Sequence, residues 1–115
     1  MSGLDATFAA LSDPTRRAVV DLLRREPRRA GELAQALAMS PPAMSRHLRV
    51  LRESGLVEEE RPEGDARVRL LHLRPEAFGE LRRWVDEVEQ FWSGQLASFK
   101  AHAERRARSR SRSRR

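Results

Sequence analysis

Two helix-start signals constrain what the first half of the chain can fold into. In each, a residue that can cap a helix comes directly before a proline: Asp13 before Pro14, and Ser40 before Pro41. Proline suits the first position of a helix, because its missing N–H would have no partner there. The pattern predicts a series of short helices separated by abrupt turns.

The spacing of apolar residues predicts the other elements. A row of Met44, Leu48 and Leu51 gives the helix that starts at Pro41 a buried side, and Gly55 is placed to end that helix. We expect helices over 5–11, 14–26, 30–37 and 41–54, strands over 56–61 and 67–73 around the turn-rich segment 62–66, and a long helix from Pro75. The predicted fold class is mostly α with a β-hairpin, in the order of four helices, two strands and a fifth helix.

A short helix, a tight turn, a capped helix and then a hairpin form a winged helix-turn-helix. The major groove of DNA admits one such helix, whose first residues reach base edges. Ser45, Arg46 and Arg49 lie opposite the apolar row, and Arg46 is our candidate for a bidentate contact to guanine. A solvent-exposed face is the alternative for any row of arginines, but the turn and the hairpin favour DNA.

Other residues of this region are predicted to contact phosphates. Ser40 stands at the helix start, where free backbone N–H groups bind anions. Glu63 and Asp65 put negative charge at the loop tip, which argues against deep insertion into the minor groove. The full set of predicted DNA-binding residues is Ser40, Pro41, Pro42, Ser45, Arg46, Arg49, Arg61, Arg67 and Arg69.

Overall basicity is a poor argument for this function. The net charge is +6, but seven of the 23 basic residues lie within 105–115, and the other 104 residues hold 16 basic and 17 acidic residues. The arginine and serine repeat of that end predicts a disordered segment over 104–115 after a folded domain over 1–103. It either adds phosphate contacts or is a solvated appendage.

The long final helix has more apolar surface than a small monomer can cover. Both tryptophans and three of the four phenylalanines lie on it. This surplus predicts a partner helix from a second copy of the chain. The residues expected at the dimer interface are Leu4, Phe8, Leu11, Trp84, Val88, Phe91, Trp92 and Leu96.

Several segments resemble the ArsR-type winged-helix transcriptional regulators. They are Phe8–Arg17, Gly31–Ala34, Ser40–Leu51 and Gly55–Val57, and the similarity extends over about residues 4–100. The resemblance implies a homodimeric, cytoplasmic, prokaryotic repressor that binds a palindromic operator, with the first and last helices forming the dimer interface. The alternative from another class is a winged-helix module that docks a protein without preference for any DNA sequence.

Metal-sensing members of that family carry cysteines in the third helix, or aspartate and histidine ligands on the last one. This chain has no cysteine, and Asp86 and His102 are about 24 Å apart along one helix, so we expect no metal site and no cofactor. The three histidines fall on separate predicted elements, and no nucleophile motif is present, so we expect no enzyme. No apolar run is long enough to span a membrane, and the sequence identifies no small-molecule inducer.

Overall fold

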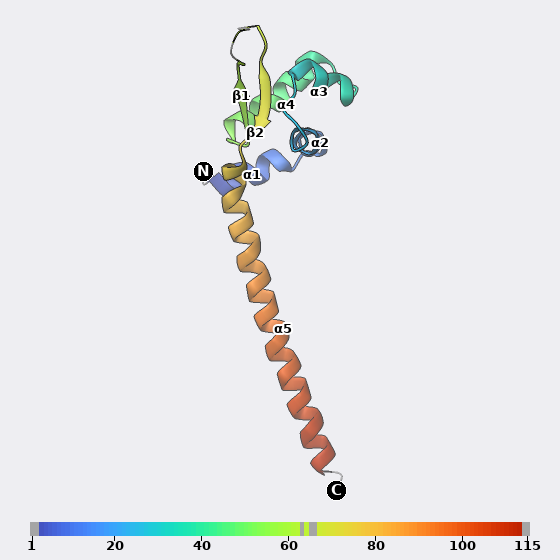
Figure 1. Ribbon diagram of the computed structural model, residues 1–115. Coiled ribbons are helices and arrows are strands. Elements are labelled where there is room, and N and C mark those ends of the chain that lie inside the picture. Colours follow the sequence, from blue (N-terminus) through green and yellow to red (C-terminus); the bar gives the residue numbers. More distant parts are fainter. Residues whose placement is uncertain (1–2, 63, 65–66, 114–115) are drawn as a thin grey trace. The chain divides into compact units, whose positions relative to one another are not determined.

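The computed structural model describes residues 3–62, 64 and 67–113 (Figure 1). Glu63, Asp65, Arg114 and Arg115, about which the sequence made predictions, lie outside the described residues. The elements are α1 (Gly3–Leu11), α2 (Pro14–Leu23), α3 (Ala30–Ala36), α4 (Pro41–Glu53), β1 (Val57–Glu60), β2 (Leu70–Leu73), the 3₁₀ turn η1 (Pro75–Phe78) and α5 (Gly79–Ser113). The predicted element order and fold class are confirmed.

The chain divides into two compact units, one up to residue 81 and one from residue 82. In the first unit, both predicted helix starts are present. The Asp13 carboxylate accepts hydrogen bonds from the backbone N–H groups of Thr15 at 2.7 Å and Arg16 at 3.1 Å. The Ser40 hydroxyl accepts one from Ala43 at 3.3 Å. These caps satisfy N–H groups that have no partner inside the helix.

The core of the first unit is aliphatic. Met44, Leu48 and Leu51, the predicted inner row of α4, are at most 3% exposed. The buried residues around them come from α1, α2, α3, the turn after α4 and both strands: Ala10, Val19, Leu23, Leu33, Ala34, Leu56, Val57 and Leu71. This core fixes which side of α4 faces outward.

Two turns at the ends of α3 and α4 set the direction of the chain around α4. Gly55 has φ +80°, and the Leu56 N–H reaches back to the Leu51 carbonyl at 3.1 Å, which is the hydrogen bond of a Schellman motif. Ala38 ends α3 in the same way with φ +51°, and the Met39 N–H donates to the Ala34 carbonyl at 2.9 Å. Left-handed backbone costs an alanine more than a glycine.

The hairpin pairs Val57 with Leu73 and Glu60 with Leu70 in antiparallel register. Its strands are shorter than predicted, and its connection is longer. Arg28, between α2 and α3, pairs its backbone with strand β2 of the hairpin, and this pairing was not predicted from the sequence. Its N–H donates to the Leu71 carbonyl at 3.1 Å, and the Leu71 N–H donates back at 2.8 Å.

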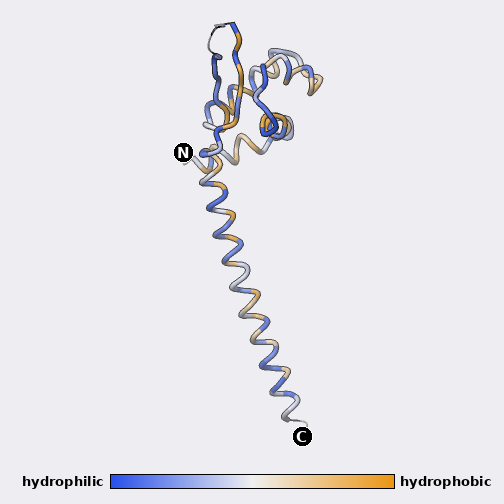
Figure 2. The backbone as a smooth tube through the Cα atoms, in the orientation of Figure 1, coloured by the Kyte–Doolittle hydropathy of each residue, from blue (hydrophilic) through white to orange (hydrophobic). Residues whose placement is uncertain are grey.

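The second unit is the greater part of α5. The helix continues to Ser113, which differs from the expected disorder beyond residue 103. Arginine and alanine are good helix formers, and a helix already nucleated extends at low cost, which accounts for this difference. Hydrophilic and hydrophobic residues alternate along α5 (Figure 2). Large apolar side chains are more than a third exposed on it: Trp84, Val85, Phe91, Trp92, Leu96 and Phe99.

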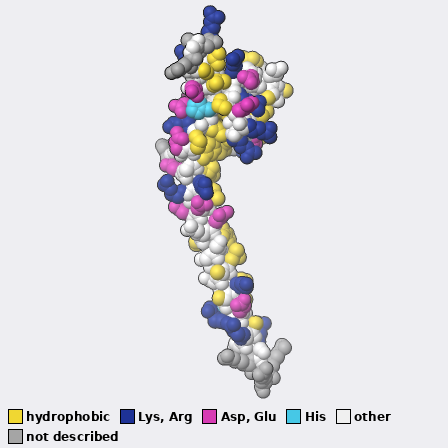
Figure 3. Space-filling view, viewed as in Figure 1, with side chains coloured by type: hydrophobic (Ala, Val, Ile, Leu, Met, Phe, Trp, Pro, Cys, Tyr) yellow, Lys and Arg dark blue, Asp and Glu magenta, His cyan; other side chains and the backbone are white. Residues whose placement is uncertain are grey.

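These exposed apolar side chains interrupt the charged surface of α5 (Figure 3). The rings of Phe91 and Trp92 meet edge to face, with centroids 6.2 Å apart. The last helix also begins differently from the prediction, since residues Pro75–Phe78 form a 3₁₀ turn before the α-helix starts at Gly79. Within the described residues, no helix is both long and apolar enough to cross a membrane.

Candidate nucleic-acid interface

The outward face of α4 carries a group of cationic side chains. Ser45, Arg46, Arg49 and Arg52 are all exposed and line one open hollow of about 260 Å³. Arg46 and Arg49 lie opposite the buried Met44, Leu48 and Leu51, and Ser45 and Arg52 lie beside them, between the two sides of the helix. From the sequence, DNA contacts were predicted for the first three, whereas Arg52 was placed on the same side of the helix without a predicted contact.

Arg46 and Arg49 differ in their ion-pair partners. Among the residues that the structure describes, Arg46 contacts no carboxylate. Arg49 Nε lies 3.7 Å from Glu53 Oε1, one turn away, and both side chains are about three-quarters exposed. Such an exposed pair is worth little to stability. Arg46 and Arg49 are therefore available to an anionic partner.

The start of α4 lies at one end of this face. Ser40, Pro41 and Pro42 are exposed, as the prediction of a contact there requires. The Ser40 hydroxyl oxygen caps the helix by accepting a hydrogen bond from the Ala43 N–H. The hydroxyl proton is still available to donate to a phosphate oxygen. The N-terminal end of a helix dipole also favours a negative charge at this point.

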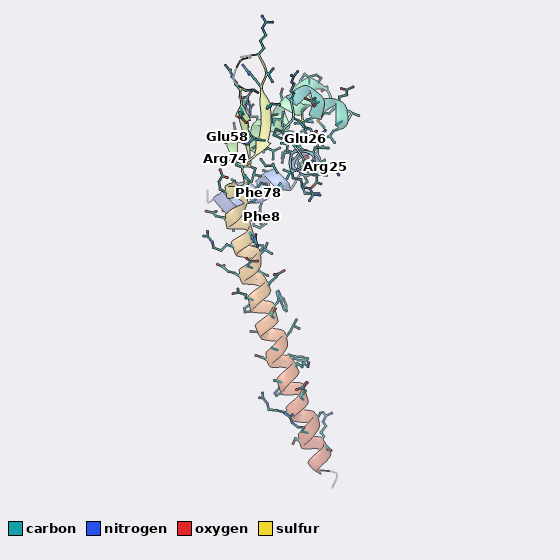
Figure 4. All side chains as sticks on the ribbon, in the orientation of Figure 1. Phe8, Arg25, Glu26, Glu58, Arg74 and Phe78 are labelled. Atoms are coloured by element: carbon teal, nitrogen blue, oxygen red, sulfur yellow. The ribbon has the colours of Figure 1, made fainter. Side chains whose placement is uncertain are left out.

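The hairpin contributes a second set of arginines. Arg61, Arg67 and Arg69 are exposed, and all three lie in the connection between β1 and β2. Arg69 Nε lies 3.5 Å from Glu59 Oε1, an ion pair that was not predicted from the sequence. The opposite face of the hairpin carries Glu58, which lies 3.7 Å from Arg74 Nε (Figure 4).

A smaller hollow of about 180 Å³ lies between α4 and the hairpin. Its polar lining includes Ser45, Arg52, Glu59 and Arg69, above an apolar floor that includes Leu48 and Leu71. The two hollows share Ser45 and Arg52, so the outer face of α4 and the hairpin form a continuous surface.

His47 is half-buried beside the inner row of α4, at the edge of the core. Its Nδ1 lies 3.4 Å from Arg16 Nη1. Among the described residues, no three histidine, aspartate or glutamate side chains gather as a metal site would require.

Comparisons with known proteins agree with this geometry. A family model described as a helix-turn-helix domain matches residues 11–60. The HTH-type transcriptional regulator Rv2034 of Mycobacterium tuberculosis is 40% identical over 95 residues, which cover 83% of each chain. An ArsR-like transcriptional regulator from Rhodococcus sp. RHA1 has a similar structure, with a TM-score of 0.75, 31% identity and coverage of 89% of this chain and 91% of that one. The chain belongs to the ArsR family of winged helix-turn-helix transcriptional regulators.

A third ArsR-type comparison concerns assembly. The winged helix-turn-helix DNA-binding domain Mb0332 from Mycobacterium bovis, solved as a homodimer, has a TM-score of 0.61 and 25% identity, and covers 76% of this chain and 79% of that one. In this ArsR-type chain, the residues predicted at a dimer interface fall on α1 and α5. Leu4, Leu11 and Val88 are half-buried, and Phe8, Trp84, Phe91, Trp92 and Leu96 are exposed.

Proposed function

We propose that this ArsR-type regulator is a homodimeric repressor that binds a palindromic operator in double-stranded DNA. The observation that carries the proposal is the outward face of α4, where Arg46 and Arg49 stand opposite a row of buried apolar residues, with Ser45 beside them. A helix of this size fits the major groove. A protein bound over an operator occupies DNA that a polymerase would need, and this is the sense in which it represses.

The proposed contacts follow from chemistry and position. Arg46 makes a bidentate contact to guanine, because the two parallel N–H groups of a guanidinium match the acceptors on the guanine edge. No carboxylate among the described residues competes for this guanidinium. Ser45 and Arg49 contact a base or a phosphate beside it. The helix start at Ser40, Pro41 and Pro42 binds a phosphate, and Arg61, Arg67 and Arg69 contact the backbone along the hairpin.

The dimer is supported by the apolar surface of the terminal helices. Phe91, Trp92 and Leu96 are each about 60% exposed, and burying such side chains between two copies is strongly favourable. A two-fold axis places two α4 helices on one face of the duplex, about 34 Å apart, which is one turn of DNA. The operator is then an inverted repeat. The proposal gives the chain a binding role without catalysis, metal or cofactor, and leaves any inducer open.

Selection of duplexes from a randomised library tests the proposal. The proposed function predicts enrichment of an inverted repeat whose half-sites are centred about 10 base pairs apart. Sedimentation at micromolar concentration should show a dimer that binds one such duplex. A library that stays unenriched, while the chain forms a stable complex with another protein, would instead support a protein-docking module.

A further inference from the structure

One carboxylate on the hairpin contacts two arginines of the α4 and hairpin surface. Glu59 Oε2 lies 3.0 Å from Arg52 Nη1, and Glu59 Oε1 lies 3.5 Å from Arg69 Nε. Glu59 therefore links α4 to the chain that leads into β2, and each of its oxygens faces a different guanidinium. The side chain is 27% exposed, whereas its neighbours Glu58 and Glu60 are 56% and 61% exposed.

The alternation of side chains along β1 separates these three glutamates. Glu59 points to the side where α4 packs and lines the hollow that it shares with Arg52 and Arg69. Glu58 and Glu60 point to the other side, where both lie 3.9 Å from His72 Nε2. Of the acidic run on β1, only Glu59 faces the arginines of the proposed DNA interface.

The position of Arg52 gives this contact its importance. Arg52 lines the outer hollow of α4 together with Arg46 and Arg49, and it also lines the second hollow with Glu59. Ion pairs as exposed as these add little to folding stability. Their main effect is on the electrostatic field at the surface, where the negative charge of Glu59 offsets part of the charge of two arginines.

We propose that Glu59 determines specificity, as a positioning residue that restrains Arg52 and Arg69 at the DNA interface; this inference rests on the proposed function. Binding to an arbitrary sequence depends almost entirely on phosphate contacts. A restrained, partly neutralised arginine pair cannot adjust to the phosphates of a loosely docked duplex. On the operator, base contacts from α4 already fix the position of the protein along the duplex. Restraining Arg52 and Arg69 therefore lowers the affinity for the operator only a little.

The test compares wild-type protein with Glu59→Gln at about 0.1 M salt, on the duplex enriched by the library selection and on a shuffled version of it. Each additional phosphate contact steepens the salt dependence by about 0.9 and raises affinity roughly fivefold to tenfold at this salt concentration. We expect that gain on the shuffled duplex and less than a twofold change on the enriched one, so that the preference falls at least about 2.5-fold. Equal changes on both duplexes would overturn the inference.

Glu58→Gln is the matched control. It removes the same charge from the same strand, but Glu58 contacts Arg74 and His72 instead of Arg52 and Arg69. Its preference for the enriched duplex should stay close to that of the wild type, and a fall like that of Glu59→Gln would show that net charge alone is responsible. Replacing Arg52 and Arg69 with glutamine in the Glu59→Gln protein should abolish the gain on the shuffled duplex, and persistence of the gain would overturn the inference.

A shorter carboxylate gives a second variant if Glu59→Gln folds poorly. Glu59→Asp keeps the charge but cannot reach both guanidinium groups, so we expect an intermediate loss of preference, and no loss would contradict a positioning role. Thermal unfolding of each variant checks that the fold is intact. A wild-type protein with no preference for any duplex would overturn the proposed function itself, whereas a normal preference that Glu59→Gln leaves unchanged overturns only this inference.

Discussion

The guanidinium of Arg16 lies 3.4 Å from His47, and it connects three helices at one point. Arg16 belongs to α2, and its Nε donates to the Ala10 carbonyl at 2.6 Å while its Nη2 donates to the Ala9 carbonyl at 3.1 Å. Those carbonyls belong to the last turn of α1, and that of Ala9 also accepts the N–H of Ser12 at 3.4 Å and its hydroxyl at 2.7 Å. Arg16 thus satisfies the end of α1 and contacts the helix proposed to enter the major groove.

Replacing Arg16 with alanine should therefore destabilise the fold. Two charge-assisted hydrogen bonds are lost, although the Ala9 carbonyl keeps those from Ser12, so we expect a loss of about 2 kcal/mol in the free energy of unfolding. Urea denaturation measures it. Arg17→Ala is the control, since Arg17 makes one exposed bond to the Leu11 carbonyl and should cost clearly less. Equal losses for the two variants would refute the special position of Arg16.

The Asp13 cap makes stability depend on acid. The backbone N–H of Arg16, opposed by desolvation and assisted by the N–H of Thr15, lowers the pKa of Asp13 below its ordinary value. A carboxyl with a lowered pKa in the folded state contributes stability that is complete above its unfolded pKa and is lost as the pH falls through the folded one.

Measuring the urea midpoint of unfolding as the pH is lowered below about 4 tests this contribution. Asp13→Ser keeps a hydroxyl that can cap α2 but removes the ionisable group. The variant should lose less stability than the wild type over this range. If the urea midpoints of the two proteins fall equally as the pH is lowered, the Asp13 carboxylate contributes no pH dependence to stability.

Gly55 has a left-handed backbone conformation that strains any residue with a side chain. Its φ of +80° ends α4 through the Schellman motif, so Gly55→Ala should cost about 1 kcal/mol in unfolding free energy. Gly31→Ala is a control of opposite sign, because Gly31 lies in α3 with open space around it and alanine favours helix. Calorimetry should show Tm moving in opposite directions for the two variants, and parallel shifts would contradict the account.

The proposal that the exposed apolar side of α5 forms the dimer interface can be tested by measuring the oligomeric state of variants. Leu96 is 63% exposed and lies on the same helical stripe as Trp92, so Leu96→Glu should place a charge in the proposed dimer interface and favour the monomer. Gln90→Glu makes a comparable change on the opposite side of the helix and should leave the dimer intact. Sedimentation velocity separates the two states. A dimer that tolerates Leu96→Glu would place the interface elsewhere.

The elements that depend on local signals were predictable from the sequence. Asp13–Pro14, Ser40–Pro41 and Gly55 mark helix ends through hydrogen bonds within a few residues, and each lies where expected. The inner row of α4 follows from helical spacing, and so does the exposure of Arg46 and Arg49. Their contact with DNA is still a prediction.

Features that depend on distant residues were not predictable. The pairing of Arg28 with Leu71 joins segments that no local pattern connects, and the three glutamates of β1 gave no indication that Glu59 alone would meet Arg52. The end of α5 was missed for another reason. A repeat of arginine and serine has no apolar period, so composition favoured disorder where helix propagation extends the element.

The most direct test of the account is the preference of Arg46→Ala for its operator. Anisotropy titration gives the ratio of affinities for the enriched duplex and a shuffled one. Arg24→Ala is the control, because Arg24 is exposed just after α2 and is paired with Asp21. Loss of one bidentate guanine contact should lower this ratio about tenfold, with a smaller change on the shuffled duplex. An unchanged ratio in Arg46→Ala would show that the outward face of α4 does not select the sequence.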